Sequence, residues 1–128
     1  MIFACDISAE MISWMEENLL KTYSNILPMK IDGTSLPIED NSTDLVFMIT
    51  LHHELDQPIK SLMECFRVLK EGGKICIVDW KKEEMTKGPN IDIRCEPEDI
   101  KGQLRSSGFK NISINNELNE FFLIIAEK

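Results

Sequence analysis

The sequence predicts an α/β fold built on a mostly parallel sheet with a C-terminal antiparallel hairpin. Three observations predict it. An apolar run from Leu45 to Leu51 is bounded by turn residues and stops at the polar His52, which is typical of a strand in a parallel sheet. Strand and helix patterns alternate along the chain. The last two strand patterns are joined by a short segment around residues 115–117, which indicates a hairpin rather than a crossover.

The first third of the chain reads as strand, helix and strand. An apolar segment from Ile2 to Cys5 ends at Asp6, and Ser8 can cap the helix that follows. A second short strand is expected over Met29 to Asp32. A strap from Gly33 to Thr43 then leads to the apolar run described above, which we expect to be buried on both faces. The helix carries an apolar stripe at helical spacing, formed by Met11, Ile12, Met15 and Leu19.

Helix and strand patterns alternate again in the rest of the chain, with Pro at the start and Gly at the end of the helices. The expected elements are a helix that begins at Asp56 and Pro58 and closes at Gly72-Gly73, a strand from Ile75 to Val78 that ends in Asp79, a polar loop from Lys81 to Glu96, a helix from Pro97 to Gly108, and strands over Phe109–Ile114 and Phe121–Ala126.

Composition places the chain among globular proteins and excludes several partners. The 128 residues are 43% hydrophobic and 28% charged, so we expect a single domain over residues 1–128. The net charge of -8 argues against nucleic acid and anionic lipid as partners. No apolar run approaches the ~18 residues of a membrane span, and no basic segment precedes the first apolar residues, so a cytoplasmic protein is expected. The four cysteines lack Cys-x-x-Cys spacing, which favours reduced thiols.

Two acidic residues follow consecutive predicted strands. Asp6 and Asp32 would lie at the carboxyl ends of their strands, where an open α/β sheet binds ligands. A carboxylate can accept hydrogen bonds from both ribose hydroxyls. Each Asp could instead only end its strand or cap the next helix. The two residues together favour a nucleoside site.

The segment His52-His53-Glu54 does not predict a metal site. It lacks the His-Glu-x-x-His spacing that places two ligands on one helix face, and no third ligand is evident. The two histidines are then surface or capping residues, or they line a ligand cleft. Glycine-x-Ser-x-Gly and phosphate-binding glycine motifs are absent, so hydrolase and triphosphatase functions have no support.

Several segments, in order, resemble successive motifs of class I S-adenosylmethionine-dependent methyltransferases, in particular those of type 11. The resemblance covers almost the whole chain and implies a Rossmann-like methyltransferase sheet. The segments are Cys5-Asp6-Ile7-Ser8, Asp32-Gly33-Thr34-x-Leu36-Pro37-Ile38 with Asp44-Leu45-Val46, Leu51-His52-His53 with Asp56, and Phe66-Arg67-Val68-Leu69-Lys70-x-Gly72-Gly73.

The resemblance also implies roles for individual residues, with S-adenosylmethionine as cofactor and a small molecule as methyl acceptor. Asp6 would bind the ribose hydroxyls, Ile7 would pack on adenine, Asp32 would accept the adenine amine, and the backbone of Gly33 would contact the ring. Thr50 and Leu51 would border the methionine end. His52, His53, Asp79 and Trp80 would face the substrate, with His53 as the candidate base or substrate contact.

The chain departs from the family pattern at one point. Family members have a strand and a glycine-rich loop before the strand that corresponds to Ile2–Asp6, whereas the first glycine here is Gly33. The resemblance therefore implies a sheet that lacks its usual first strand, between the Asp6 strand and the Leu45 strand. Those two strands could pair directly, a second copy could pair across the exposed edge as a homodimer, or the natural chain could be longer.

Two functions follow from the sequence. The first is a methyltransferase, or the C-terminal portion of one, that acts on a small molecule. The alternative is a non-catalytic remnant of the methyltransferase fold that binds an adenosyl ligand or a protein.

Overall fold

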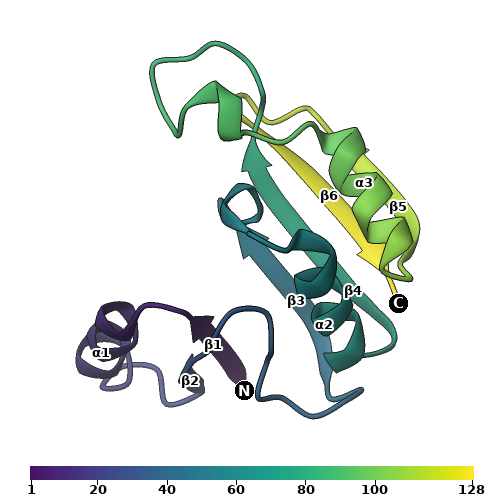
Figure 1. Cartoon of the computed structure of the whole chain (residues 1–128). Helices are drawn as coiled ribbons and strands as arrows, with labels where there is room; N and C mark the ends of the chain where they lie inside the picture. Colours follow the sequence, from purple (N-terminus) through teal and green to yellow (C-terminus); the bar gives the residue numbers. More distant parts are fainter. The chain divides into compact units, whose positions relative to one another are not determined.

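The computed structural model describes all residues from 1 to 128, and its internal contacts divide them into two compact units. Unit 1 is Met1–Ile38 and unit 2 is Glu39–Lys128. Each unit contains one sheet: a two-stranded sheet in unit 1 and a four-stranded sheet in unit 2 (Figure 1). Of the three alternatives left open by the sequence, direct pairing between the Asp6 strand and the Leu45 strand is therefore not what the structure shows. The expectation of a single domain over residues 1–128 stays a prediction.

Unit 1 contains β1 (Ile2–Asp6), α1 (Ala9–Asn18) and β2 (Ile26–Lys30), and its two strands are parallel. Ser8 caps α1 as predicted, because its side chain accepts a hydrogen bond from the Met11 amide at 3.2 Å. The prediction of a strand over Met29–Asp32 is wrong at both ends. Pro28 lies within β2, which pairs only with β1 and so tolerates a missing donor on its open edge.

None of the residues of unit 1 is buried. Large apolar side chains such as Ile7, Met11 and Trp14 are 67%, 46% and 52% exposed. A two-stranded sheet with one helix is marginally stable when it covers so little apolar surface. The core of the protein lies entirely in unit 2.

Unit 2 is a mixed sheet with the strand order β3-β4-β6-β5, in which β3 and β4 are parallel and the other two pairs are antiparallel. The predicted C-terminal antiparallel hairpin is confirmed. The elements are β3 (Thr43–Ile49), the 3-10 helix η1 (His52–Glu54), α2 (Pro58–Val68), β4 (Leu69–Trp80), the 3-10 helix η2 (Ile91–Ile93), α3 (Pro97–Ser106), β5 (Lys110–Asn115) and β6 (Phe121–Glu127).

The predicted end of α2 at Gly72-Gly73 is wrong. The helix ends at Val68, and the glycines lie inside β4, where the pairing with β3 slips between Thr43↔Leu69 and Leu45↔Lys74. Leu69 is fully buried, which favours turning the chain into the sheet before the glycines are reached. A Cβ on Gly73 would lie 2.8 Å from the Lys70 carbonyl oxygen, so the slip itself requires glycine there.

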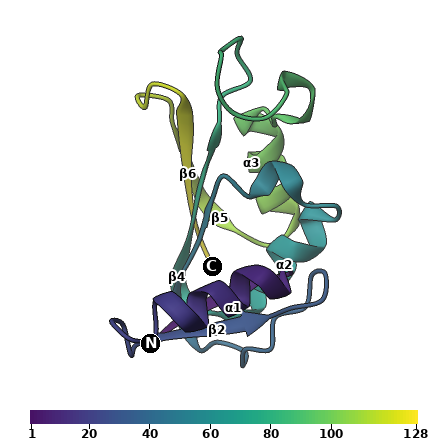
Figure 2. The same ribbon diagram turned by 90° about the vertical axis from the view of Figure 1, so that its left-hand side faces the viewer.

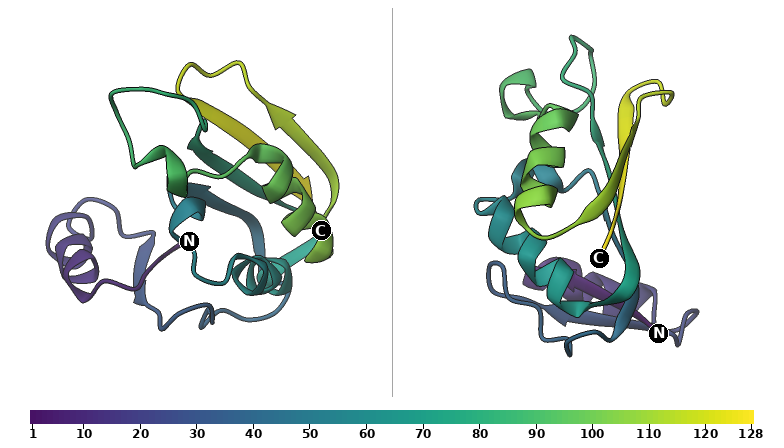
Figure 3. Two further views of the ribbon diagram at one scale, coloured as in Figure 1. Left: turned by 45° about the horizontal axis from the view of Figure 1, so that its top comes forward. Right: turned by 90° about the vertical axis from the view of Figure 1, so that its right-hand side faces the viewer.

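Helices α2 and α3 pack on the same face of the four-stranded sheet (Figures 2 and 3). No helix in the chain is long and apolar enough to cross a membrane. The expectation that the Leu45–Leu51 strand is buried on both faces is wrong, because Leu45, Phe47 and Ile49 are 55%, 56% and 61% exposed. The core beneath the helices consists of Met48, Leu62, Cys65, Leu69, Ile75, Ile77, Ile100, Leu104, Phe109, Phe122, Ile124 and Ala126.

Candidate functional site

Asp6 and Asp32 follow the two parallel strands of unit 1 at the same edge of their sheet. Asp6 ends β1, and its register partner Lys30 ends β2, two residues before Asp32. Asp6 Oδ1 accepts a hydrogen bond from the Ser8 amide at 2.8 Å, whereas Oδ2 has no hydrogen-bond partner. The Asp32 side chain is 98% exposed, and its Oδ1 lies 3.2 Å from Lys30 Nζ. Asp6 therefore orders the entry into α1 and still keeps one acceptor oxygen for a ligand.

Ile7 directly follows Asp6, and Gly33 directly follows Asp32. Ile7 provides exposed apolar surface beside its acid, and Gly33 provides backbone that no side chain covers. Ile7 is 67% exposed, which is unusual for an isoleucine directly after a strand. Gly33 has φ +71°, and no atom lies within 4 Å of the position that a Cβ would occupy. A planar group can approach the backbone closely there.

Thr50 and Leu51 lie at the carboxyl end of β3 in unit 2. Thr50 has φ +51°, a left-handed conformation that is costly for a β-branched residue, and its amide donates to the Val78 carbonyl at 2.8 Å. Leu51 is 41% exposed. Backbone strain of this kind persists when the surroundings hold it and is concentrated at functional sites.

His53 and Asp79 form a buried pair between the ends of two adjacent parallel strands. Asp79, in β4, is 1% exposed, and the His53 side chain is 4% exposed. Asp79 Oδ1 lies 2.8 Å from His53 Nδ1 and accepts from the Trp80 amide at 2.8 Å, while Oδ2 accepts from the His53 amide at 2.9 Å. A carboxylate accepts all of these bonds when Nδ1 carries the hydrogen, which leaves Nε2 as the basic atom of the neutral ring. The family resemblance predicted both residues on the substrate side, but it did not predict that they form a pair.

His52 is buried without a hydrogen-bond partner. It is 2% exposed, and neither ring nitrogen is bonded; Oε1 of the nearby Gln103 on α3 is also unbonded. Burial lowers the pKa of His52 below its ordinary value of 6.5, against the opposing influence of Asp79 and Gln103, and His53 lowers it further. The neutral ring is therefore the form that the fold accommodates. No three His, Cys, Asp or Glu side chains in the chain are grouped so that they could hold a metal ion.

We expect acid to destabilise the protein through His52. In the unfolded chain His52 titrates near 6.5, whereas its folded-state pKa is lower, so between these values the unfolded state binds more protons. The free energy of unfolding should therefore fall as the pH drops below about 6.5, by at most about 1.4 kcal/mol per pH unit from this group. Urea unfolding at about pH 7.5 and about pH 5.5 measures the loss. The free energy of unfolding of the His52→Leu variant should fall less between these two pH values. An equal fall in both proteins would contradict the assignment of the acid effect to His52.

Trp80 anchors the loop that follows β4. Its ring packs on Phe121 at a centroid distance of 4.4 Å, Arg94 lies over it at 5.8 Å, and a Cβ on Gly88 would lie 2.8 Å from it. Arg94 is 4% exposed and donates hydrogen bonds to the backbone carbonyls of Lys81, Glu83, Lys87 and Pro89. The predicted polar loop from Lys81 to Glu96 is therefore ordered around a buried arginine. Nothing in the sequence pattern distinguished Arg94 from a solvated basic residue.

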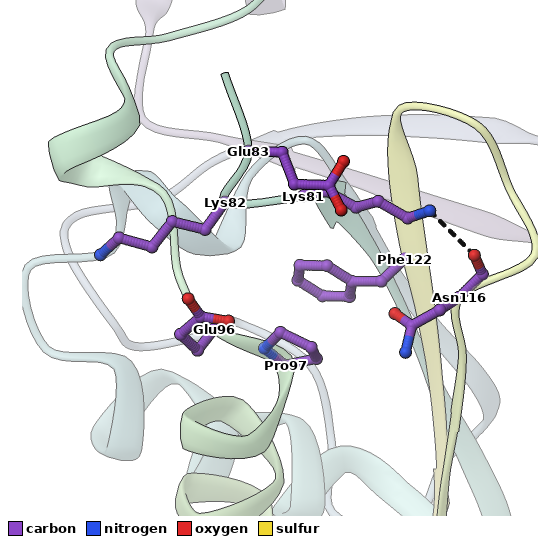
Figure 4. Close-up of a pocket in the computed structure, with 7 residues that line it drawn as sticks. All are labelled: Lys81, Lys82, Glu83, Glu96, Pro97, Asn116 and Phe122. Carbon is purple, nitrogen blue, oxygen red and sulfur yellow. Dashed lines mark hydrogen bonds between the residues drawn. The ribbon is translucent and has the colours of Figure 1, made fainter. Parts of the chain in front are cut away.

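A pocket of about 350 Å³ lies beside this loop, between the end of β4 and the start of α3 (Figure 4). The Lys81 ammonium points towards Asn116 and donates a hydrogen bond to its carbonyl at 2.8 Å. The ring of Phe122 lies between Lys81 and Pro97. Its lining carries both signs of charge and includes none of the residues predicted from the sequence. The lining residues are Lys81, Lys82, Glu83, Glu96, Pro97, Asn116 and Phe122.

Comparison with known proteins assigns the family. A family model described as a methyltransferase domain matches residues 1–77, which is more than half of the chain. The chain belongs to this methyltransferase family. The matched range includes the acids of unit 1, the end of β3 and the His52-His53 segment, and it stops just before Asp79.

Individual relatives support the same assignment. The chain is 30% identical over 81 residues to the ubiquinone/menaquinone biosynthesis C-methyltransferase UbiE of Pseudoalteromonas translucida (strain TAC 125), a match that covers 62% of this chain and 32% of that protein. The chain thus spans about a third of that relative. A SAM-dependent methyltransferase from Aquifex aeolicus has a similar structure, with a TM-score of 0.87 and 31% identity over 97% of this chain and 66% of that one. The structure described as PigF with SAH shares the fold, with a TM-score of 0.75 and 20% identity over 99% of this chain and 43% of that one.

The Rossmann-like methyltransferase fold expected from the sequence is confirmed by these structures. The four-stranded sheet of unit 2 is more mixed than expected, because two of its three strand pairs are antiparallel.

Proposed function

We propose that the chain is an S-adenosylmethionine-dependent methyltransferase, or the C-terminal portion of one, that transfers a methyl group to a small-molecule acceptor. Family membership supports the reaction class. The observation that carries the proposal for this chain is the pair of carboxylates at one edge of the β1–β2 sheet. Asp6 has a free acceptor oxygen there, and Asp32 is almost fully exposed. Such acceptors at the carboxyl ends of parallel strands suit the hydroxyls and amine of an adenosine.

The residues of that edge fit the adenosine part of the proposed cofactor. Asp6 would hold the ribose hydroxyls and Asp32 the exocyclic amine, because both carboxylates can accept hydrogen bonds. The exposed side chain of Ile7 offers apolar surface to the adenine ring, and the missing Cβ of Gly33 allows the ring to approach the backbone. In unit 2, Thr50 and Leu51 are the proposed contacts of the methionine part.

His53 is the proposed base or substrate contact. When bound, S-adenosylmethionine supplies a methyl group on a positively charged sulfur, so the protein mainly has to align the acceptor and exclude water. A base is needed only when the acceptor carries a proton at the reacting atom. Nε2 of His53 is the atom that would accept it, since Nδ1 is bonded to Asp79. Asp79 then acts as a positioning residue, and the buried His52 supports the substrate side without an open face of its own. Trp80 is only half-buried and stays a proposed residue of the substrate side.

A second candidate function is a module that binds an adenosyl ligand or a protein without turnover. The observation that favours it is the absence of any buried residue in unit 1, which carries four of the proposed cofactor contacts. Methyl transfer needs those contacts to be held rigidly, whereas binding alone does not.

We also propose a cytoplasmic location and a small-molecule substrate. No disulfide bond joins any of the four cysteines, which suits a reducing compartment. The net charge of -8 disfavours nucleic acid and anionic lipid surfaces as partners.

Calorimetric titration with S-adenosylhomocysteine tests the proposed site. Asp6→Ala should weaken binding at least tenfold, because a hydrogen bond to a charged group is worth about 1.5 to 3 kcal/mol. Glu17→Ala, which removes an exposed carboxylate from α1, is the matched control and should bind like the unmodified chain. Adenosine alone should bind to the same carboxylates. Equal affinities of the Asp6 and Glu17 variants would contradict the site.

Release of S-adenosylhomocysteine from S-adenosylmethionine in the presence of an acceptor separates the two candidate functions. An enzyme gives turnover, whereas a binding module gives heat on titration and no product.

A further inference from the structure

The ring of His53 lies between two carboxylates. On one side, Nδ1 is 2.8 Å from Oδ1 of Asp79. On the other side, Nε2 is 3.7 Å from Oε1 of Glu54. The two carboxylates differ in their surroundings, because the side chain of Asp79 is 2% exposed and that of Glu54 is 67% exposed. One carboxylate is therefore closed off from solvent, and the other is open to it.

The backbone around Glu54 is held in place beside the His53 ring. The Glu54 amide donates a hydrogen bond to the Leu51 carbonyl at 2.9 Å. The His53 amide donates to Asp79 Oδ2 at 2.9 Å, which ties this turn of the chain to the end of β4. The next residue, Leu55, packs against the core of unit 2. The backbone of Glu54 is therefore fixed on both sides, while its exposed side chain is able to turn.

The atom proposed as the base is almost closed off from water. The His53 side chain is 4% exposed, so a proton accepted by Nε2 has little direct contact with solvent. The protonated ring carries a positive charge at a buried position, and the carboxylate of Asp79 stabilises this charge. A ring that keeps its proton does not accept another one. The proton therefore needs a group that passes it to the solvent before the next turnover.

The distance of 3.7 Å between Nε2 and Glu54 suits such a group. In the neutral ring with hydrogen on Nδ1, Nε2 and the carboxylate are both acceptors, so they form no hydrogen bond. Nε2 therefore stays open to a substrate. Once it is protonated, Nε2 becomes a donor, and a turn of the Glu54 side chain or one bridging water closes the distance. Burial lowers the pKa of the neighbouring His52, so its ring does not compete for the proton.

We propose that Glu54 is the exit for the proton that His53 takes from the methyl acceptor, a role that rests on the proposed function. The acceptor atom gains a methyl group, loses a proton to Nε2 and keeps the electron pair of its bond to that proton. The proton then passes from Nε2 to Oε1 of Glu54 and on to water, which returns His53 to its neutral form. One proton leaves for each methyl group transferred, and no further reactant is consumed. Glu54 acts through His53 and does not touch the substrate.

Proton exchange at the His53 ring measures this route without cofactor or methyl acceptor. Near the midpoint of the ring's titration, line widths in nitrogen NMR report how fast Nε2 gains and loses its proton. Glu54→Ala should slow this exchange by about tenfold or more, because a carboxylate carries protons and a methyl group does not. Asp56→Ala removes an exposed carboxylate two residues further along the chain and is the matched control. It should exchange like the unmodified chain.

Added formate provides a readout that a merely structural role of Glu54 would not change. This small carboxylate should restore fast exchange in Glu54→Ala, whereas sodium chloride at the same ionic strength should not. The urea midpoints of the Glu54 and Asp56 variants should stay close to that of the unmodified chain, because both side chains are exposed.

Three results would overturn the proposal: unchanged exchange in Glu54→Ala, an equal slowing in Asp56→Ala, or slow exchange that formate does not restore. The outcome is separate from that of the proposed cofactor site. Glu54→Ala should bind S-adenosylhomocysteine with the affinity of the unmodified chain, and a failure of that titration in the unmodified chain concerns the cofactor site rather than Glu54.

Discussion

Asp79→Ala should lower the free energy of unfolding of unit 2 by about 3 kcal/mol or more. The substitution removes the acceptor of three hydrogen bonds, from the His53 amide, His53 Nδ1 and the Trp80 amide. The pair is almost completely buried, and each buried donor left without a partner costs about 1 to 3 kcal/mol. Losses of this size are a large share of the stability of a typical domain.

Urea unfolding followed by circular dichroism measures this loss, with Asp44→Ala as the control. Asp44 is also an aspartate bonded to a basic group, but its side chain is 83% exposed, so its removal should cost less than about 1 kcal/mol. Nitrogen NMR of the His53 ring adds a readout specific for the pair: Nδ1 should carry the hydrogen in the unmodified chain and lose this preference in Asp79→Ala. Similar losses of stability in the two variants would contradict the account of a buried pair.

Leu62→Ala should destabilise unit 2 by about 2 to 5 kcal/mol. Leu62 lies on the inner face of α2, is 0% exposed and belongs to the core against the sheet, so its truncation leaves a cavity. The neighbouring Met63 is 55% exposed, and Met63→Ala should change stability by no more than about 0.5 kcal/mol. Both substitutions introduce the same residue into the same helix, so helix propensity cancels in the comparison. Chemical denaturation of the two variants measures the difference, and comparable midpoints would mean that α2 does not cover the core.

The alternation of strands and helices, the helix starts and the C-terminal hairpin could be predicted from the sequence because each has a local cause. Ser8 is a capping residue, Pro58 and Pro97 stand at the first positions of α2 and α3, and Gly108 follows α3 with φ +103°. The positions of Asp6 and Asp32 at one edge followed from the parallel arrangement of β1 and β2. These features need no knowledge of distant contacts.

The errors arose where tertiary context outweighs a local signal. Gly72-Gly73 resembles a helix end, but the burial of Leu69 starts the strand earlier. Phe47 is apolar and was expected to be buried, although no element of its unit covers that face of the sheet. The pairing of His53 with Asp79 joins residues 26 positions apart, and Arg94 is buried by carbonyl groups of its own loop. Such partners are set by three-dimensional packing and leave no periodic pattern in a single sequence.

The central claim is that this chain holds an adenosyl ligand through the carboxylates that follow β1 and β2. The most direct measurement is a calorimetric titration of the unmodified chain with S-adenosylhomocysteine. The account predicts saturable heat with one ligand per chain, strongly reduced by Asp6→Ala and unchanged by Glu17→Ala. No heat at millimolar ligand, with the core of unit 2 shown to be folded by its urea transition, would contradict it.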